Sequence, residues 1–191
     1  SDIKATKITA GLEALGIPTC GYSLAPEERS LYSISNRKGI INESFSDIRD
    51  FESVNNFMRQ TKPSLVIHLA AQPLVLESYN NPKLTFETNV LGTLNILESG
   101  FKSDSVKGIL VATTDKVYRN TINGKRFIET DPLEGSDPYS SSKVAAEAVV
   151  KAWQKIRSIS SGPSVLIARA GNVIGGGDYS DRLIPKYINF L

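Results

Sequence analysis

The 191-residue chain is poor in the two side chains that most often bind zinc, with a single cysteine, Cys20, and a single histidine, His68. A lone cysteine excludes an internal disulfide and is typical of a protein in a reducing cytoplasm. So few soft ligands argue against a zinc site, and we expect no metal and a structural role for His68. No apolar stretch approaches the length of a membrane span, and the start shows no signal-peptide pattern.

An excess of charge of one sign is also absent. Lysine and arginine number 22 against 20 aspartates and glutamates, and the basic residues are scattered along the chain. This balance gives no drive toward nucleic acid or an anionic membrane. The apolar fraction of 40% is ordinary for a globular protein. The sequence therefore predicts one dinucleotide-binding and catalytic domain over residues 1–191, long enough to bury a core.

A strand followed by a glycine-rich turn is missing near the start. Such a turn normally opens a dinucleotide-binding domain, because its backbone amides bind the pyrophosphate. Here the chain passes directly into a predicted helix, and Gly11 and Gly16 lie within or after it. A later run, Gly175-Gly176-Gly177, lacks the lysine and hydroxyl residue of a P-loop and is typical of a flexible loop.

What the chain does contain is a regular alternation of short apolar runs and longer amphipathic ones. The pattern predicts strands at residues 19–23, 39–42, 65–69, 108–113 and 165–170. It predicts helices at residues 4–15, 47–60, 82–100 and 138–156, with a last one beginning near Leu183. This alternation indicates an α/β fold with a doubly wound, mostly parallel, Rossmann-like sheet that lacks the usual first strand.

The runs at residues 64–69 and 108–113 are apolar on both faces, which is typical of parallel strands covered by helices. Sheets of this kind bind ligands beyond the carboxyl ends of their strands. We therefore expect the site to be formed by Asp47 and by residues 23–26, 70–73, 113–116 and 170–172.

The strongest chemical signal is Tyr139-Ser-Ser-Ser-Lys143. Asp137 is suited to cap a helix and Pro138 to begin it, so Tyr139 and Lys143 share one helix face. A phenol beside a cation ionises more easily and can act as a base near neutral pH. Together with the hydroxyl of Thr114 at the end of a neighbouring strand, the pair predicts hydride-transfer chemistry at an alcohol carbon.

A second match to the same spacing, Tyr79-Asn-Asn-Pro-Lys83, tests how specific the signal is. Pro82 lies inside it, and proline breaks or starts a helix rather than continuing it. Tyr79 and Lys83 therefore need not share a face, and we expect only the pair at Tyr139 and Lys143 to be catalytic.

With these residues in view, the chain resembles the extended short-chain dehydrogenase/reductase family, and more narrowly the CDP-glucose 4,6-dehydratases. The segments that carry the resemblance are Gly21-Tyr-Ser-Leu-Ala-Pro, His68-Leu-Ala-Ala-Gln-Pro-Leu-Val, Thr114-Asp-Lys-Val-Tyr, Asp137-Pro-Tyr-Ser-Ser-Ser-Lys and Arg169-Ala-Gly-Asn-Val-Ile-Gly-Gly-Gly-Asp. The Tyr-x-x-x-Lys element is common to the superfamily, whereas Thr-Asp-Lys together with the last segment is far more selective.

The resemblance implies an enzyme that uses bound NAD to dehydrate a nucleotide hexose, with CDP-glucose giving CDP-4-keto-6-deoxyglucose. Tyr139 would remove the proton of the C4 hydroxyl, aided by Lys143 and Thr114. Asp115 would protonate the oxygen that departs from C6. Lys116 stands where the related dTDP-glucose enzymes have a glutamate as the C5 base, so it is either that base or a solvated loop lysine.

The resemblance also implies further contacts. Asp47 and Ile48 would contact adenine, although Asp47 equally suits a helix N-cap. Ala70 and Ala71 would leave room for adenosine or serve close packing, and Asn89 would shape the active-site helix or be a buried, hydrogen-bonded residue. The remaining cofactor contacts would be Thr113, Tyr139 and Lys143, and the substrate contacts would be Gln72, Asn172 and Arg182.

Two departures from the family leave other functions open. The first strand with its glycine-rich loop, and most of the C-terminal substrate domain, are absent, so we expect an internal piece of a longer enzyme. A UDP-hexose 4-epimerase shares the tyrosine and lysine but usually has small residues where Asp115 and Lys116 stand. A non-catalytic sugar-nucleotide-binding module would fit the missing loop.

The resemblance implies, finally, a cytoplasmic homodimer whose product serves lipopolysaccharide O-antigen synthesis. The helices at residues 82–100 and 138–156 would pair with their copies as a four-helix bundle. Small residues permit such close approach, and an isologous dimer uses the same patch on both partners. The pairing stripe is expected at Val144, Ala148, Lys151 and Ala152. The positions expected to face the sheet are Ala145, Val149 and Trp153.

Overall fold

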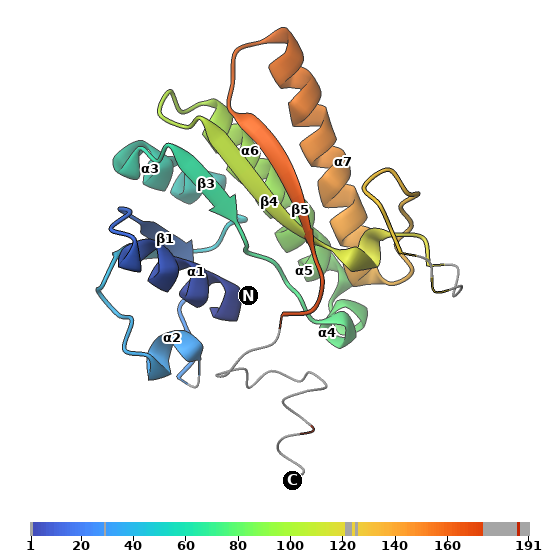
Figure 1. Ribbon diagram of the computed structural model, residues 1–191, viewed down its shortest axis with the longest axis horizontal. Coiled ribbons are helices and arrows are strands. Elements are labelled where there is room, and N and C mark those ends of the chain that lie inside the picture. The colour runs from blue at the N-terminus through green and yellow to red at the C-terminus, as the bar shows by residue number, and fades with distance from the viewer. Residues whose placement is uncertain (1, 29, 121–123, 125, 174–186, 188–191) are drawn as a thin grey trace. The chain divides into compact units, whose positions relative to one another are not determined.

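The computed structural model describes residues 2–28, 30–120, 124, 126–173 and 187, which belong to two compact units (Figure 1). The first unit comprises Ser1–Asp47 and Asn172–Leu191, and the second comprises Ile48–Gly171. The helix predicted to begin near Leu183 starts outside the described residues. That residues 1–191 act as a single domain stays a prediction.

The first unit contains a two-stranded parallel sheet. Helix α1 (Asp2–Ala14) is followed by β1 (Cys20–Ser23), the short helix α2 (Leu31–Ile34) and β2 (Asn42–Phe45). Strand β1 pairs with β2 in the register Cys20 to Asn42. Helix α1 ends at Ala14, and two residues later Gly16 has a φ of 67°, in the left-handed region that favours glycine.

The second unit contains a three-stranded parallel sheet in the order β3-β4-β5. The strands are β3 (Leu65–His68), β4 (Gly108–Thr114) and β5 (Ser164–Ala170). Helices α3 (Phe51–Thr61), α4 (Val75–Asn80) and α5 (Pro82–Phe86) precede a π-helical turn, η1 (Glu87–Leu91), which continues into α6 (Gly92–Phe101). A 3₁₀ turn, η2 (Asp115–Val117), follows β4, and α7 (Pro138–Ile159) precedes β5.

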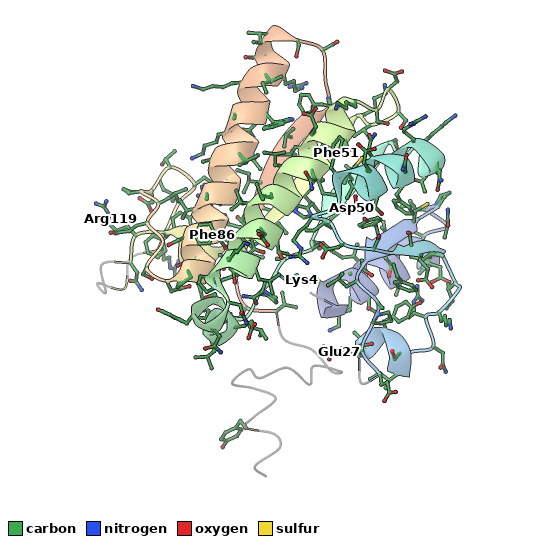
Figure 2. All side chains as sticks on the ribbon, turned by 180° about the vertical axis from the view of Figure 1, so that it is seen from behind. Lys4, Glu27, Asp50, Phe51, Phe86 and Arg119 are labelled. Carbon is green, nitrogen blue, oxygen red and sulfur yellow. The ribbon has the colours of Figure 1, made fainter. Side chains whose placement is uncertain are left out.

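Helices α6 and α7 lie side by side on one face of this sheet (Figures 1 and 2). Alternate β4 side chains, Ile109 and Val111, are buried beneath them. Helix α6 packs closely on its neighbours, because a Cβ at either of two glycines would clash. A Cβ added to Gly92 would meet Cδ1 of Ile48, and one added to Gly100 would lie 2.5 Å from Cδ1 of Ile109. No helix in the described part of the chain is long and apolar enough to cross a bilayer.

The predicted α/β fold with parallel strands is confirmed, with several local corrections. Strand β2 begins three residues later than expected, and the short helices α2 and α4 were not predicted. The helix predicted from Asp47 begins at Phe51, because Asp50 and not Asp47 is its N-cap: the Asp50 carboxylate accepts from the Ser53 amide at 3.1 Å.

The buried face of α7 lies about one residue further along the helix than the sequence predicted. Ala145, Val149 and Trp153 are only half-buried, whereas Ala146, Glu147 and Val150 are fully buried. The sequence suggested otherwise because Glu147 is charged and therefore looks solvent-exposed. In the expected pairing stripe, Ala148, Lys151 and Ala152 are exposed and Val144 is half-buried, and the pairing itself stays a prediction.

His68, at the end of β3, is a buried side chain that the fold keeps neutral. Its Nε2 lies 3.0 Å from the hydroxyl of Thr93 on α6, and that hydroxyl donates to the carbonyl of Asn89 at 2.7 Å. Burial, and secondarily the charge of Lys143, lower the pKa of His68 to about 3. This environment agrees with the structural role expected for the residue.

The first prediction concerns the acid sensitivity that this burial creates. Unfolded histidine binds a proton below about pH 6.5, whereas native His68 does so only near pH 3, so native stability falls as the pH drops through this window. Between pH 7.5 and 5 we expect a loss on the order of 2 kcal/mol from this group alone.

The variant His68→Gln, which keeps a hydrogen-bonding group beside Thr93, should lose much less stability between the same two pH values. Urea-unfolding midpoints of wild type and variant at pH 7.5 and 5 measure the difference. Equal losses in the two proteins would show that the acid sensitivity originates elsewhere.

Candidate active site

The first turn of α7 brings Tyr139 and Lys143 onto one buried face. Asp137 caps the helix: its carboxylate accepts from the Ser140 amide at 2.9 Å, and its own amide donates to the Ser140 hydroxyl at 3.1 Å. This capping box and Pro138 in the first turn make the start of the helix definite. Tyr139 and Lys143 are both buried, one helical turn apart.

The second Tyr-x-x-x-Lys match has a different structure. Tyr79 lies in α4 and Lys83 in α5, because Pro82 begins a new helix. The Tyr79 side chain is 60% exposed, and Lys83 forms a surface ion pair with Glu87 at 3.7 Å. The expectation that Pro82 separates Tyr79 from Lys83 is thus confirmed, and the catalytic role of Tyr139 and Lys143 stays a prediction.

Lys143 lies against β4, with 5% of its surface exposed. Its Nζ donates to the carbonyl of Ala112 at 3.3 Å. Thr113, the next residue along β4, donates its hydroxyl to the carboxylate of Glu147, one turn after Lys143, at 2.8 Å. Residues expected to bind the cofactor therefore also hold α7 on the sheet.

Thr114 ends β4 and shapes the turn that carries the two predicted elimination residues. Its hydroxyl accepts from the Lys116 amide at 3.3 Å and donates to the Asp115 carboxylate at 3.1 Å. Thr114 is buried, whereas Asp115 and Lys116 are exposed. A Cβ added to Gly171, just after β5, would lie 3.6 Å from Oδ2 of Asp115, so the ends of β4 and β5 meet beside this carboxylate.

Asn89 joins the loop after β3 to helix α7. Its Oδ1 accepts from the Gln72 amide at 2.8 Å, and its Nδ2 donates to the Gln72 carbonyl at 3.1 Å and to the Ser142 hydroxyl at 2.8 Å. The side chain is fully buried and lies in the π-helical turn η1, a distortion found often at functional sites. Asn89 thus positions the residue next to Lys143.

The loop that Asn89 holds contains three predicted contacts. Ala70 and Ala71 are half-buried. The side-chain amide of Gln72 bonds within the protein, donating to the Leu74 carbonyl at 3.1 Å and to the Thr85 hydroxyl at 2.9 Å. A role for these residues at the cofactor or substrate stays a prediction.

The remaining predicted contacts are spread over both units. Ile48 packs on Gly92, and its carbonyl accepts from Nδ2 of Asn95 at 2.9 Å. Asp47 belongs to the first unit, where its carbonyl accepts from the Tyr22 hydroxyl at 3.0 Å. Asn172 also belongs to the first unit, and Arg182 lies outside the described residues. Their predicted roles stay predictions.

The first unit has a cavity of about 360 Å³ at the predicted strand-end segment. Ala25 and Pro26, which follow β1, form part of its lining together with the cationic side chains of Arg37 and Lys38. Cationic groups next to the end of a parallel strand suit a phosphate or ribose hydroxyl. In the ranges that the structure describes, no group of three acidic, histidine or cysteine side chains could hold a metal ion.

Sequence reasoning missed the buried pair formed by Glu147 and Arg169. Arg169 donates from Nε to Oε1 of Glu147 at 2.9 Å and from Nη2 to Oε2 at 2.7 Å. The Glu147 carboxylate raises the pKa of Arg169 above its ordinary value. A signal was present: Glu147 follows Lys143 by one helical turn on the buried face, and Arg169 interrupts an apolar strand.

Comparison with known proteins identifies the family. A family model described as GDP-mannose 4,6 dehydratase matches residues 28–189. The CDP-glucose 4,6-dehydratase of Salmonella typhimurium is 39% identical over 97% of this chain and 54% of that protein. The human dTDP-D-glucose 4,6-dehydratase is 33% identical over 85% of this chain and 45% of that protein. The chain thus spans about half the length of the curated relatives it matches.

Solved structures are similar over the same region. The UDP-glucose 4-epimerase of Thermus thermophilus, in complex with NAD, is 30% identical with a TM-score of 0.73, over 85% of this chain and 50% of that one. A double mutant of DesIV, a dTDP-glucose 4,6-dehydratase of Streptomyces venezuelae, with NAD and DAU bound, is 26% identical with a TM-score of 0.72, over 82% of this chain and 46% of that one. These matches confirm the resemblance to extended short-chain dehydrogenases/reductases, and the chain belongs to the GDP-mannose 4,6 dehydratase family.

Proposed function

We propose that this chain carries the catalytic centre of an NAD-dependent nucleotide-hexose 4,6-dehydratase that converts CDP-glucose to CDP-4-keto-6-deoxyglucose. The proposal rests on the presence of two groups of residues in one unit. One is the buried Tyr139 and Lys143 on α7, and the other is the turn with Asp115 and Lys116 at the end of β4. The similarity to the Salmonella CDP-glucose enzyme along 97% of the chain supports this substrate.

Tyr139 and Lys143 would handle the proton at C4. The Tyr139 phenol, in its ionised form, takes the C4 hydroxyl proton, and the ammonium of Lys143 stabilises the phenolate. Thr113, Tyr139 and Lys143 would contact NAD, which would supply the acceptor for the hydride from C4 and the donor of that hydride to C6. The Lys143 ammonium, with one proton already donated to the Ala112 carbonyl, is suited to the hydroxyls of the nicotinamide ribose.

The turn after β4 would perform the elimination. A ketone at C4 acidifies the C5 proton, so a base can remove it while Asp115 protonates the oxygen leaving C6, and water departs. Hydride delivery to C6, with a proton returned to C5, then gives the 4-keto-6-deoxy sugar. Lys116, exposed beside Asp115, is the candidate C5 base, and a solvated loop lysine is the alternative.

Two other functions remain as alternatives. A UDP-hexose 4-epimerase is supported by the 30% identical Thermus structure, but an epimerase has no departing C6 oxygen to protonate and so no use for Asp115. A non-catalytic sugar-nucleotide-binding module is the other alternative. The burial of both Tyr139 and Lys143, one helical turn apart on α7, supports catalysis over binding alone.

The second prediction tests the reaction directly. The full-length protein that contains this chain, incubated with NAD and CDP-glucose deuterated at C4, should give a 4-keto-6-deoxy sugar with the deuterium at C6. Mass spectrometry and NMR of the product measure the transfer. Deuterium that is lost to solvent or stays at C4 contradicts a dehydratase, inversion at C4 with the C6 hydroxyl retained indicates an epimerase, and unchanged substrate indicates a binding module.

The third prediction concerns the base. Tyr139→Phe removes the phenol and should lower turnover on the order of 10²–10⁴-fold. The matched control is Tyr79→Phe, the same change at the exposed tyrosine of the other Tyr-x-x-x-Lys segment, which should leave turnover unchanged. Equal losses from both substitutions would show that Tyr139 is not the base.

The finer assignments concern assembly and location. We propose a cytoplasmic homodimer, with O-antigen synthesis as the use of the product. Helix α7 and the continuous helix from α5 to α6 pack on each other, and both expose apolar side chains. Leu84 and Leu91, on one face two turns apart, are 37% and 51% exposed, and Ala148 and Ala152 are exposed on α7. Paired with a second copy, these surfaces would form a four-helix bundle.

The fourth prediction tests this interface. Ala148→Arg places a long cation in the proposed stripe and should convert a dimer to a monomer in sedimentation equilibrium, without loss of helical signal. Gln60→Arg, at an exposed position on α3 and so outside both helices of the proposed bundle, is the control and should stay dimeric. A dimer that survives Ala148→Arg would place the interface on another surface.

A further inference from the structure

Arg169 connects four separate segments of the second unit through one guanidinium group. On one side it forms the two-pronged contact with Glu147 described above, and Glu147 also accepts from the Thr113 hydroxyl. The Glu147 carboxylate is fully buried and receives three donors. Arg169 on β5, Thr113 on β4 and Glu147 on α7 are thereby fixed to one another.

On its other side, Arg169 holds the chain that follows the 3₁₀ turn η2. Its Nη1 donates to the Tyr118 hydroxyl at 2.9 Å and to the Glu129 carbonyl at 3.0 Å. The guanidinium carbon lies 4.8 Å from the centroid of the Tyr118 ring, within the range of a cation–π contact. Tyr118 is stacked on Phe127 with centroids 4.7 Å apart and an interplanar angle of 3°. Tyr118 follows η2 directly, so this contact acts on the turn that carries Asp115 and Lys116.

The same segment returns to the start of α7. The Glu134 amide donates to the Val117 carbonyl at 2.8 Å, and the Arg119 amide donates to the Pro132 carbonyl at 2.9 Å. A Cβ added to Gly135 would lie 2.3 Å from Cα of Ser141, two residues after Tyr139. The loop thus packs on the first turn of α7 and on η2 together.

The net contribution of a buried ion pair to stability is small, because desolvation of both charges offsets their attraction. Its geometry, however, is specific: the planar fork of arginine meets the carboxylate in two parallel bonds, which the ammonium of lysine cannot reproduce. A pair that contributes little stability but fixes geometry is suited to positioning, and this one lies between the two parts of the proposed site.

We propose that Arg169 is a positioning residue that sets the turn bearing Asp115 and Lys116 relative to the helix bearing Tyr139 and Lys143. The inference rests on the proposed dehydratase function. Hydride removal at C4 needs Tyr139 and Lys143, which the capping box and the Asn89 contact still hold on α7 when Arg169 is changed. Elimination at C6 also needs Asp115 in place. Loss of Arg169 therefore slows elimination much more than hydride removal.

The test compares the two half-reactions in the full-length protein. In Arg169→Lys and in Tyr118→Phe, reduced cofactor, followed by its absorbance, should still form in a single turnover with CDP-glucose. Formation of the 4-keto-6-deoxy product should fall on the order of 10- to 100-fold, as in Asp115→Asn, because a displacement of about 1 Å is enough for such a loss. KM should change little. Arg119→Lys, the same substitution at an exposed arginine of this loop paired with Glu134, is the control and should behave as wild type.

Two further measurements separate positioning from a contribution to folding alone. The double variant Glu147→Leu with Arg169→Met removes both charges and should restore thermal stability, yet its elimination should remain slow. Tyr118→Phe keeps the pair of Glu147 and Arg169 but removes the hydroxyl that accepts from Arg169. In the absence of cofactor, trypsin should therefore cleave this variant faster after Arg119 or Arg126, while its melting temperature stays unchanged.

Normal product formation in the folded double variant, or an equal slowing of both half-reactions in Tyr118→Phe, would overturn the proposal. If Arg169→Lys fails to fold, Tyr118→Phe and the double variant decide the matter. If the proposed dehydratase function itself is wrong, the wild-type protein will transfer no deuterium from C4 to C6. That result distinguishes a wrong function from a wrong role for Arg169.

Discussion

The second unit depends on polar contacts buried between α7 and the elements that it covers. Ser142 accepts from Asn89, Lys143 donates to Ala112, and Glu147 accepts from Thr113 and Arg169. A buried polar group without a partner costs free energy, so each of these contacts tolerates little displacement. Apolar packing alone permits small slides of a helix on a sheet, whereas this series of directional contacts defines the position of α7. The position of Tyr139 follows from it.

The features that sequence reasoning predicted well have local causes. Strands β3, β4 and β5 are apolar runs of strand length between polar segments, and the start of α7 is defined by Asp137 and Pro138. The features that it missed depend on competition between local signals or on tertiary packing. Asp47 and Asp50 both suit an N-cap, and only the folded chain shows that Asp50 takes the role. The π-helical turn that carries Asn89 leaves no mark on a helical pattern, because its extra residue is stabilised by tertiary contacts.

The residues of the candidate site also divide into those that local sequence patterns predict and those that depend on tertiary packing. Tyr139, Lys143 and Thr114 were proposed as site residues from short segments with a definite spacing, and Asp115 from the family resemblance. Glu147 and Arg169 were not, although they lie among these residues in space, because a single charged residue in a helix or strand is usually solvated. The pairing of the fully buried Glu147 with the largely covered Arg169 becomes evident only when β5 is paired with β4 in the register Arg169 to Thr113, which brings the guanidinium to the Glu147 carboxylate.

The two parts of the site differ in how firmly the described structure holds them. Tyr139 and Lys143 are buried on a 22-residue helix with a capping box and several partners along its length. Asp115 and Lys116 are exposed on a three-residue turn, fixed at one end by Thr114 and at the other by Tyr118 and the guanidinium of Arg169. Asp115 and Lys116 can therefore be substituted without altering the packing of α7 or the sheet, whereas Val117 in the same turn is fully buried and belongs to the core. A short exposed turn depends on contacts at its ends for its position, and the contact of Arg169 with Tyr118 is the one through which the proposed acid Asp115 would be held near the sugar.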